Sequence, residues 1–256
     1  MDISVIIPAK NESRNIERTV RSVFDYLTHK GLKHEIIVVT NRSSDGTVPI
    51  VQGLLTEIPS LRLLDYPDRG GKGFAVREGM LQASGALRLF MDADNSTGIE
   101  HIERKLPYFD QGYDVVIGSI RVPGHDIASG SESWYRLLLG RLSGLYTRVF
   151  LLPGIKDTQR GFKTLTAKAA QDIFVRSSID HFGFDMEMLA LARKFGYKIK
   201  EVPVSWRNDP NGSVRLKDYL QVFLDTLRIK WKLMTGKYDR PLLIAERKAA
   251  EQPATR

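Results

Sequence analysis

Two aspartates, one residue apart, are the residues of this sequence whose spacing most directly indicates chemistry. Asp92 and Asp94 follow the apolar run at 86–91, which predicts a buried strand. Side chains two residues apart on a strand point to the same side, so both carboxylates can converge on one object. Two like charges this close call for a cation, and carboxylate oxygens suit Mg²⁺ or Mn²⁺. A simple turn at the strand end is the alternative, because Asp favours turns.

Two further polar segments could bind a ligand. Residues 8–13 follow an apolar run that predicts a first strand, and their backbone with Glu12 could contact a nucleoside; alternatively, Pro8 ends the strand and Ser13 caps a helix. Residues 70–73 are glycine-rich and open a predicted helix, whose free N–H groups and dipole suit an anion, with Lys72 adding a charge. This segment lacks the spacing of a P-loop, and an ordinary turn with a solvated lysine is the alternative.

The first 120 residues alternate between strand-like and helix-like segments. Strands are expected at 3–7, 35–40, 61–65, 86–91 and 114–118, and helices at 13–29, 46–58, 72–83 and 99–110. This alternation predicts an α/β fold with a mostly parallel central sheet covered by helices on both faces. Ligands of such sheets bind at the carboxyl ends of the strands, and the aspartate pair lies at that edge.

The second half of the chain has a different pattern. A polar loop is expected at 122–133, a polar loop around 157–163, helices at 166–176 and 184–195, and a strand at 198–206. Asp185 and Glu187 are interpreted as acids in the first turn of a helix, although a functional role stays open. We divide the chain into a catalytic domain at 1–212, an amphipathic helix at 213–238 and a disordered tail at 239–256.

Two segments are candidates for contact with a membrane. The helix expected at 217–236 carries one apolar stripe, which could lie on lipid or pack on its own domain. The stripe consists of Leu220, Phe223, Leu224, Leu227, Trp231 and Met234. The segment 134–152 is apolar but is interrupted by Arg136, Arg141 and Arg148, so it could lie at an interface or form a core helix.

Composition limits the remaining choices. The 256 residues are 42% hydrophobic, which suffices for a substantial core, and no cysteine is present, which excludes disulfides and thiolate chemistry. No signal peptide is recognised, and no run reaches the ~18 apolar residues of a membrane span. The net charge of +8 is concentrated at 120–176 and 210–256 and indicates an anionic partner there, although the absence of a recognition motif argues against nucleic acid.

Eight motifs, taken in order over residues 3–235, give the sequence a family resemblance. They are VIIPAKNES, EIIVV with SSDGT, GGKGFAVREGM, FMDADNST, YDVVIGS, LLPGIKDTQRGFK, FGFDMEML and EVPVSWRN. Together they resemble the family 2 inverting glycosyltransferases of the GT-A fold, and among these the polyprenyl-phosphate hexosyltransferases of the dolichyl-phosphate β-glucosyltransferase branch. The resemblance implies a Rossmann-like GT-A domain followed by C-terminal amphipathic helices.

The resemblance also implies roles for particular residues. Asp92 and Asp94 would bind Mg²⁺ or Mn²⁺ and the diphosphate, and Asp157 would belong to the catalytic group. The nucleotide-sugar site would comprise Pro8, Ala9, Lys10, Glu12, Val39, Asn41, Lys72, Asp92, Ala93 and Asp94. The acceptor phosphate would lie near Arg121, Arg136 and Lys163.

The implied reaction moves a hexose from a nucleotide-diphosphate sugar to a polyprenyl phosphate. UDP-glucose is the favoured donor and GDP-mannose the alternative. The enzyme would be a peripheral protein on the cytoplasmic face of the membrane, as a homo-oligomer or with a separate membrane subunit. A soluble family 2 transferase with a small polar acceptor, and a non-catalytic nucleotide-sugar-binding protein, are the competing hypotheses.

Three positions depart from the family pattern. Thr40-Asn41-Arg42 replaces the usual Asp-Asp pair after the second strand, which leaves the identity of the base open. Arg121 is displaced by one residue from the family's arginine, and Arg160 replaces a residue that is usually small.

Overall fold

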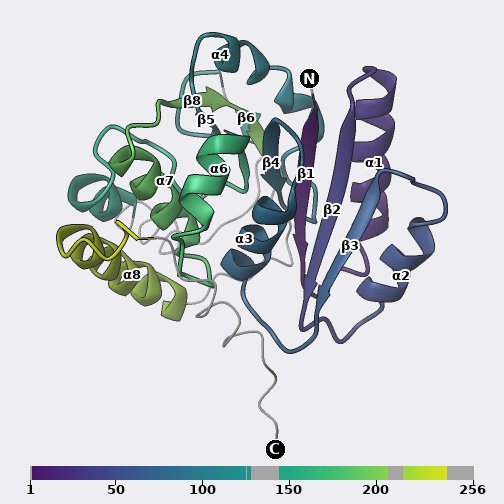
Figure 1. Ribbon diagram of the computed structural model, residues 1–256, viewed down its shortest axis with the longest axis horizontal. Helices are drawn as coiled ribbons and strands as arrows, with labels where there is room; N and C mark the ends of the chain where they lie inside the picture. Colours follow the sequence, from purple (N-terminus) through teal and green to yellow (C-terminus); the bar gives the residue numbers. More distant parts are fainter. Residues whose placement is uncertain (1, 125, 128–143, 207–215, 241–256) are drawn as a thin grey trace, which may run out of the picture.

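The computed structural model describes residues 2–124, 126–127, 144–206 and 216–240, and its central element is a seven-stranded sheet (Figure 1). The strand order is β3-β2-β1-β4-β7-β5-β8. The strands are β1 (Ile3–Ala9), β2 (His34–Asn41), β3 (Leu61–Tyr66), β4 (Leu87–Met91), β5 (Val115–Ser119), β7 (Phe162–Thr166) and β8 (Ile199–Pro203). A second sheet pairs β6 (Asp126–Ile127) with β9 (Ser205–Trp206).

The helices follow the expected order. They are α1 (Ile16–His29), α2 (Thr47–Leu54), α3 (Lys72–Gln82), η1 (Ile99–Ile102), α4 (Leu106–Asp110), a helix at 144–150, α6 (Ala167–Phe174), α7 (Phe184–Lys194) and α8 (Leu216–Met234). The single helix expected at 99–110 is divided into η1 and α4. Pro107 lies in the first turn of α4, where the missing N–H of a proline costs no helical hydrogen bond.

The mostly parallel sheet and the first five predicted strands are confirmed, whereas the strand expected at 198–206 is divided into β8 and β9, which belong to different sheets. One further strand lies in the middle of the large sheet. β7 lies between β4 and β5 and is antiparallel to both. The polar loop expected around 157–163 is therefore wrong for Phe162 and Lys163, which begin this strand. All of β7 up to Leu165 is buried.

Alternating strand residues form one hydrophobic core on each face of the sheet. Ile6, Val39 and Phe90 pack with α3, α6 and α7, whereas Val5 and Leu89 pack with α1 and α2. Figure 1 shows α3 and α6 over one face of the sheet and α1 over the other. Both faces are therefore covered, and ligands have access to this sheet only at its edges.

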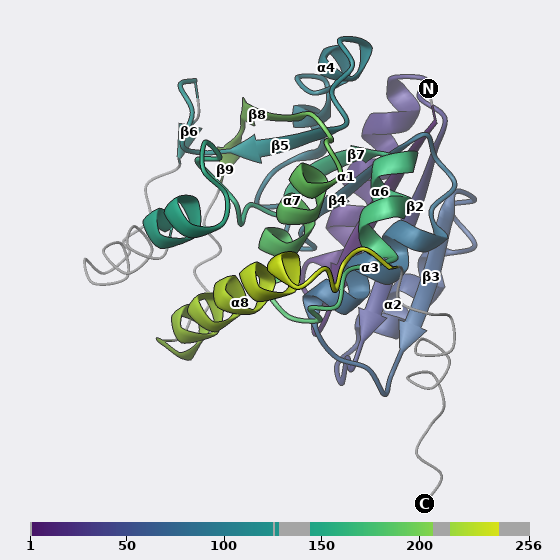
Figure 2. The same ribbon diagram turned by 60° about the vertical axis from the view of Figure 1, so that its left-hand side comes forward.

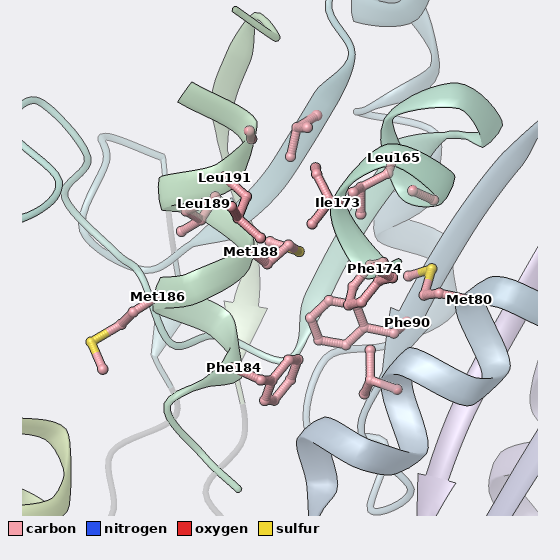
Figure 3. Close-up of a cluster of buried hydrophobic side chains, with 14 of the residues drawn as sticks. Met80, Phe90, Leu165, Ile173, Phe174, Phe184, Met186, Met188, Leu189 and Leu191 are labelled. Atoms are coloured by element: carbon pink, nitrogen blue, oxygen red, sulfur yellow. The ribbon is translucent and has the colours of Figure 1, made fainter. Parts of the chain in front are cut away.

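Helix α7 connects the sheet to the C-terminal helix. Met186, Met188, Leu189 and Leu191 all belong to the core, and Figure 3 shows the Met186 side chain on the other side of α7 from Phe90 and Phe174. The sulfur of Met186 accepts weak hydrogen bonds from Thr147 of the 144–150 helix, at 3.5 Å, and from Thr226 of α8, at 3.7 Å. The 144–150 helix and α8 thus share one contact point on α7.

The apolar stripe of α8 faces away from the protein. Val222, Asp225, Thr226 and Ile229 form the buried side of the helix. All six residues of the predicted stripe, from Leu220 (61%) to Met234 (78%), lie on the opposite side and are exposed. The contact of α8 with the domain is therefore made by the side opposite the stripe, apart from Phe223, whose ring stacks on Tyr146. No helix within the described residues is long and apolar enough to cross a membrane.

Candidate active site

Strained backbone marks the carboxyl edge of the sheet as a candidate site. Asn11, Arg42 and Asn95 have positive φ values of 57°, 49° and 57°, and they follow β1, β2 and β4 respectively. They are the non-glycine residues with positive φ in the described part of the chain. Such conformations cost free energy and concentrate at ligand-binding sites. The strain therefore falls at the edge where the topology places a ligand.

The loops after β1 and β2 are held together by polar contacts. Ser13 N donates to Asp45 Oδ2 at 3.1 Å, and Glu12 N donates to the hydroxyl of Thr47 at 2.8 Å. Burial alone would raise the pKa of Asp45, but hydrogen bonds donated by the hydroxyl and N–H of Thr47 and by Ser13 outweigh it and hold that pKa well below its usual range. Helix α1 begins only at Ile16, so the backbone of Ser13 fixes this loop and does not cap the helix.

The residues that replace the family's Asp-Asp pair hold the segment 65–71 in place. Thr40 Oγ1 donates to Asp65 Oδ1 at 2.6 Å, and Asn41 Nδ2 donates to the carbonyl of Gly71 at 2.6 Å. Arg42 Nη2 donates to the carbonyl of Asp68 at 3.0 Å. Asn41 is buried, and its amide donor is used within the protein.

The glycines before α3 allow another loop to approach closely. A Cβ on Gly71 would overlap the carbonyl of Asp180, and a Cβ on Gly73 would overlap the carbonyl of Ile179. Gly71 also has a φ of 114°, and the N–H of Phe74 donates to Asp180 O at 3.1 Å. The glycine-rich segment is therefore fixed by residues 179–181, a contact between distant segments that local sequence patterns do not predict.

Lys72 and Asp92 form an ion pair between α3 and the end of β4. Burial alone would lower the pKa of Lys72, but the charges of Asp92 and Asp185 outweigh it and raise that pKa. A Cβ on Gly161, just before β7, would overlap the Asp92 carboxylate, so this side chain is enclosed on that side. Asp94 Oδ1 accepts the N–H of Ser96 at 2.9 Å.

Lys163 occupies a different place from the predicted acceptor site. Its side chain is fully buried and forms a 2.5 Å ion pair with Asp185; it also donates to the carbonyl of Arg160. Burial raises the pKa of Asp185 even against the attraction of Lys163 and Lys72. Because its donors are directed inward, Lys163 does not present its charge to an acceptor phosphate. From sequence, Asp185 is interpreted as a helix-start acid, with a functional role left open.

Asp157 fixes the start of the segment after β5. Its carboxylate accepts the N–H of Ile120 at 3.0 Å and lies 3.5 Å from Nε of Arg160. The Arg160 guanidinium lies 4.3 Å from the ring centre of Trp206. Arg121, which follows Ile120, is exposed, and its guanidinium lies beside Gly144 in the helix at 144–150.

The other predicted residues are distributed along the same edge. Ala9 and Ala93 end β1 and follow β4, with their side chains buried, and Lys10 is exposed. Val39 belongs to the core beneath α3, so only its backbone can reach a nucleotide. Arg136 lies outside the described residues.

The donor set fits a hard divalent cation shared with a substrate. No group of three carboxylate, histidine or cysteine side chains in the described ranges could hold a metal by itself. Asp92 and Asp94 supply carboxylates, and Oδ1 of the adjacent Asn95 is a buried oxygen with no hydrogen-bond partner there. Mg²⁺ commonly binds through one or two carboxylates, substrate phosphates and water.

Comparison with solved structures defines the class of fold. Mannosyl-3-phosphoglycerate synthase from Rubrobacter xylanophilus matches with a TM-score of 0.67 at 17% identity, covering 95% of this chain and 77% of that one. Glucosyl-3-phosphoglycerate synthase from Mycobacterium tuberculosis, in complex with Mn²⁺, UDP and phosphoglyceric acid, matches with a TM-score of 0.64 at 18% identity, covering 89% and 78%. The GT-A fold is thereby confirmed, and these neighbours include complexes with a divalent metal and UDP.

The chain belongs to glycosyl transferase family 2, whose model matches residues 4–174. Dolichyl-phosphate β-glucosyltransferase from Dictyostelium discoideum is 32% identical over 249 residues, which cover 91% of this chain and 75% of that protein. The human protein of the same description is 30% identical over 254 residues, covering 92% and 77%. The resemblance carried by the eight motifs is confirmed, and the protein is a glycosyltransferase.

Proposed function

We propose that this glycosyltransferase moves a hexose, glucose first, from a nucleotide-diphosphate sugar to a polyprenyl phosphate at a membrane surface. The similar proteins described as dolichyl-phosphate β-glucosyltransferases support this acceptor class. One observation carries the proposal for this chain: the guanidinium of the exposed Arg121 lies next to Gly144, in the same helix that exposes Leu145, Val149 and Phe150. A polyprenyl phosphate has the same two parts, an anionic head and an apolar chain.

That surface, called here the apolar face, is formed by two helices. It consists of Leu145, Val149, Phe150, Leu220, Phe223, Leu224, Leu227, Trp231 and Met234, each at least 44% exposed. Tyr146 joins the two helices by stacking on Phe223, with ring centres 4.9 Å apart. Figure 2 shows both helices on the side of the molecule away from β3. Contiguous apolar surface of this kind marks an interaction site.

Basic side chains accompany the apolar face. Arg228 and Lys230 are exposed on α8, and Lys237 lies 4.1 Å from the ring centre of Trp231. Cations beside an apolar helix face suit a membrane with anionic headgroups. We therefore assign the apolar face to a lipid surface, and place the protein on the cytoplasmic side, in keeping with a chain that has no cysteine.

The donor site lies at the edge that carries Asp92 and Asp94. A bound Mg²⁺ or Mn²⁺, held by these carboxylates, would neutralise the charge that develops on the leaving diphosphate. UDP-glucose is our favoured donor, and GDP-mannose is the alternative. The residues at 8–13 and 39–41 line the same edge and are assigned to the nucleoside.

The acceptor chemistry reduces the need for a general base. A phosphate monoester is already an anion near neutral pH, so its oxygen can attack the anomeric carbon without losing a proton to the enzyme. We therefore assign Asp157 a positioning role, since its carboxylate already binds Ile120 N and faces Arg160. Displacement in a single step inverts an α-linked donor to a β-linked product.

The experiment combines transfer with membrane binding. Radiolabelled sugar transfer to polyprenyl phosphate in anionic vesicles is measured, together with flotation of the protein on the same vesicles. Leu227→Glu with Trp231→Glu should abolish flotation and reduce transfer, because two charges enter the apolar face. Leu55→Glu is the matched control, because Leu55 is an exposed apolar residue (38%) outside that face.

The competing hypotheses predict different results. A soluble transferase with a small polar acceptor would neither float with vesicles nor respond to the double substitution. A non-catalytic binding protein would bind a nucleotide sugar without transferring or hydrolysing it. Either result would refute the proposal.

A further inference from the structure

We infer that the Lys72 ammonium group takes the place beside Asp92 where a divalent cation would bind, and that it leaves this place when a nucleoside diphosphate binds. The inference rests on the proposed donor site and concerns how that site takes up its two ligands. Lys72 Nζ donates to Asp92 Oδ1, the first carboxylate of the predicted metal pair. The side chains of Lys72 and Asp92 are 23% and 30% exposed, so a ligand entering from solvent can reach both.

The surrounding backbone leaves only the lysine side chain to move. The glycines on both sides of Lys72 pack against the carbonyls of residues 179–181, which fixes the start of α3. Gly161 encloses Asp92 on the opposite side. A change of partner therefore takes place by rotation of the long Lys72 side chain, which has the torsional freedom for it.

The arrangement links the binding of metal to the binding of diphosphate. In the free protein, a divalent ion meets a carboxylate whose charge Lys72 already neutralises. A diphosphate offers Lys72 new anionic oxygens, and this releases Asp92 for the metal. Each ligand therefore raises the affinity for the other, by the same factor in both directions.

Binding of Mn²⁺, followed by the electron paramagnetic resonance signal of the free ion, tests the inference without any assay of activity. Lys72→Gln should bind Mn²⁺ about tenfold more tightly than the natural protein in the absence of nucleotide, since one repelling charge is removed. Its gain in Mn²⁺ affinity on adding UDP or GDP should be correspondingly smaller. Lys72→Arg keeps the charge and should bind free Mn²⁺ as weakly as the natural protein.

Lys33→Gln is the matched control for net charge. Lys33 is exposed at the opposite edge of the sheet, just before β2, and its loss should leave Mn²⁺ affinity unchanged. Thermal unfolding of each variant shows that it is folded; Lys72 is partly exposed, so its replacement leaves the core intact.

The outcomes separate this inference from the proposed function. Equal Mn²⁺ affinity in Lys72→Gln and the natural protein overturns the inference, whatever the transferase assay shows. If the natural protein does not bind Mn²⁺ in the presence of UDP or of GDP, both the inference and the proposed donor site are overturned. The expected Mn²⁺ affinities without sugar transfer would support the inference and refute only the proposed function.

Discussion

Replacing Lys163 with methionine should strongly destabilise the protein. Lys163 is fully buried in β7, and its loss leaves the buried Asp185 carboxylate without its 2.5 Å partner. Removing one member of a buried ion pair costs about 3–5 kcal/mol, because the remaining charge is uncompensated. For a domain of this size, such a loss lowers Tm by about 10 °C. Guanidinium unfolding followed by circular dichroism measures the change in unfolding free energy.

The effect should depend on pH in a direction that Asp185 sets. Burial already raises the pKa of Asp185 above its ordinary value, and removing Lys163 raises it further. A raised carboxyl pKa in the folded state means that stability is lost as pH rises through that pKa. The cost of Lys163→Met should therefore be largest near pH 8 and should shrink as the pH falls and Asp185 takes up a proton.

A double substitution provides the test of the physical reasoning. Lys163→Met with Asp185→Leu replaces the pair by apolar side chains and should recover most of the lost stability, as buried pairs often allow. Lys168→Met is the matched control, because the Lys168–Asp172 pair is exposed and its loss should be undetectable. A cost below about 1 kcal/mol for the single change would refute the argument, as would a double variant no more stable than Lys163→Met.

Two further substitutions test the neighbouring features. Gly73→Ala should destabilise the protein by about 2 kcal/mol or more and weaken donor binding, because the added methyl group would overlap the carbonyl of Ile179. Gly53→Ala is the control and should not destabilise the protein, because Gly53 lies on α2 with open space around it. Urea unfolding of the two variants compares their stabilities. Asp94→Ala should abolish metal-dependent transfer without lowering Tm, whereas full activity in that variant, or in EDTA, would contradict the metal assignment.

Much of the site could be predicted from sequence because its elements are local. The strand preceding Asp92, the loop at 8–13 and the glycines at 70–73 each follow from short patterns of apolar, turn and small residues. Parallel alternation then assigns their ends to one edge of the sheet, as the structure shows. The eight motifs in their order identify the glycosyltransferase family, which the short patterns of apolar and turn residues do not identify by themselves.

Contacts between distant segments could not be predicted in this way. Lys163 and Asp185 are 22 residues apart in the chain, and nothing in the sequence around either residue shows that the two side chains form a buried ion pair. β7 is short and polar in part, so its central position depends on pairing with β4 and β5.

The sequence by itself determined the family, the alternation of strands and helices, and the apolar stripe on α8, because each depends on residue type and spacing along the chain. The tertiary structure decided that the stripe points outward, that Lys72 pairs with Asp92, and that the Arg121 guanidinium lies next to Gly144 in the helix at 144–150. Periodicity shows that a helix has two sides but does not show which side the rest of the protein covers. That choice is made by packing, here by Val222 and Ile229 against the core.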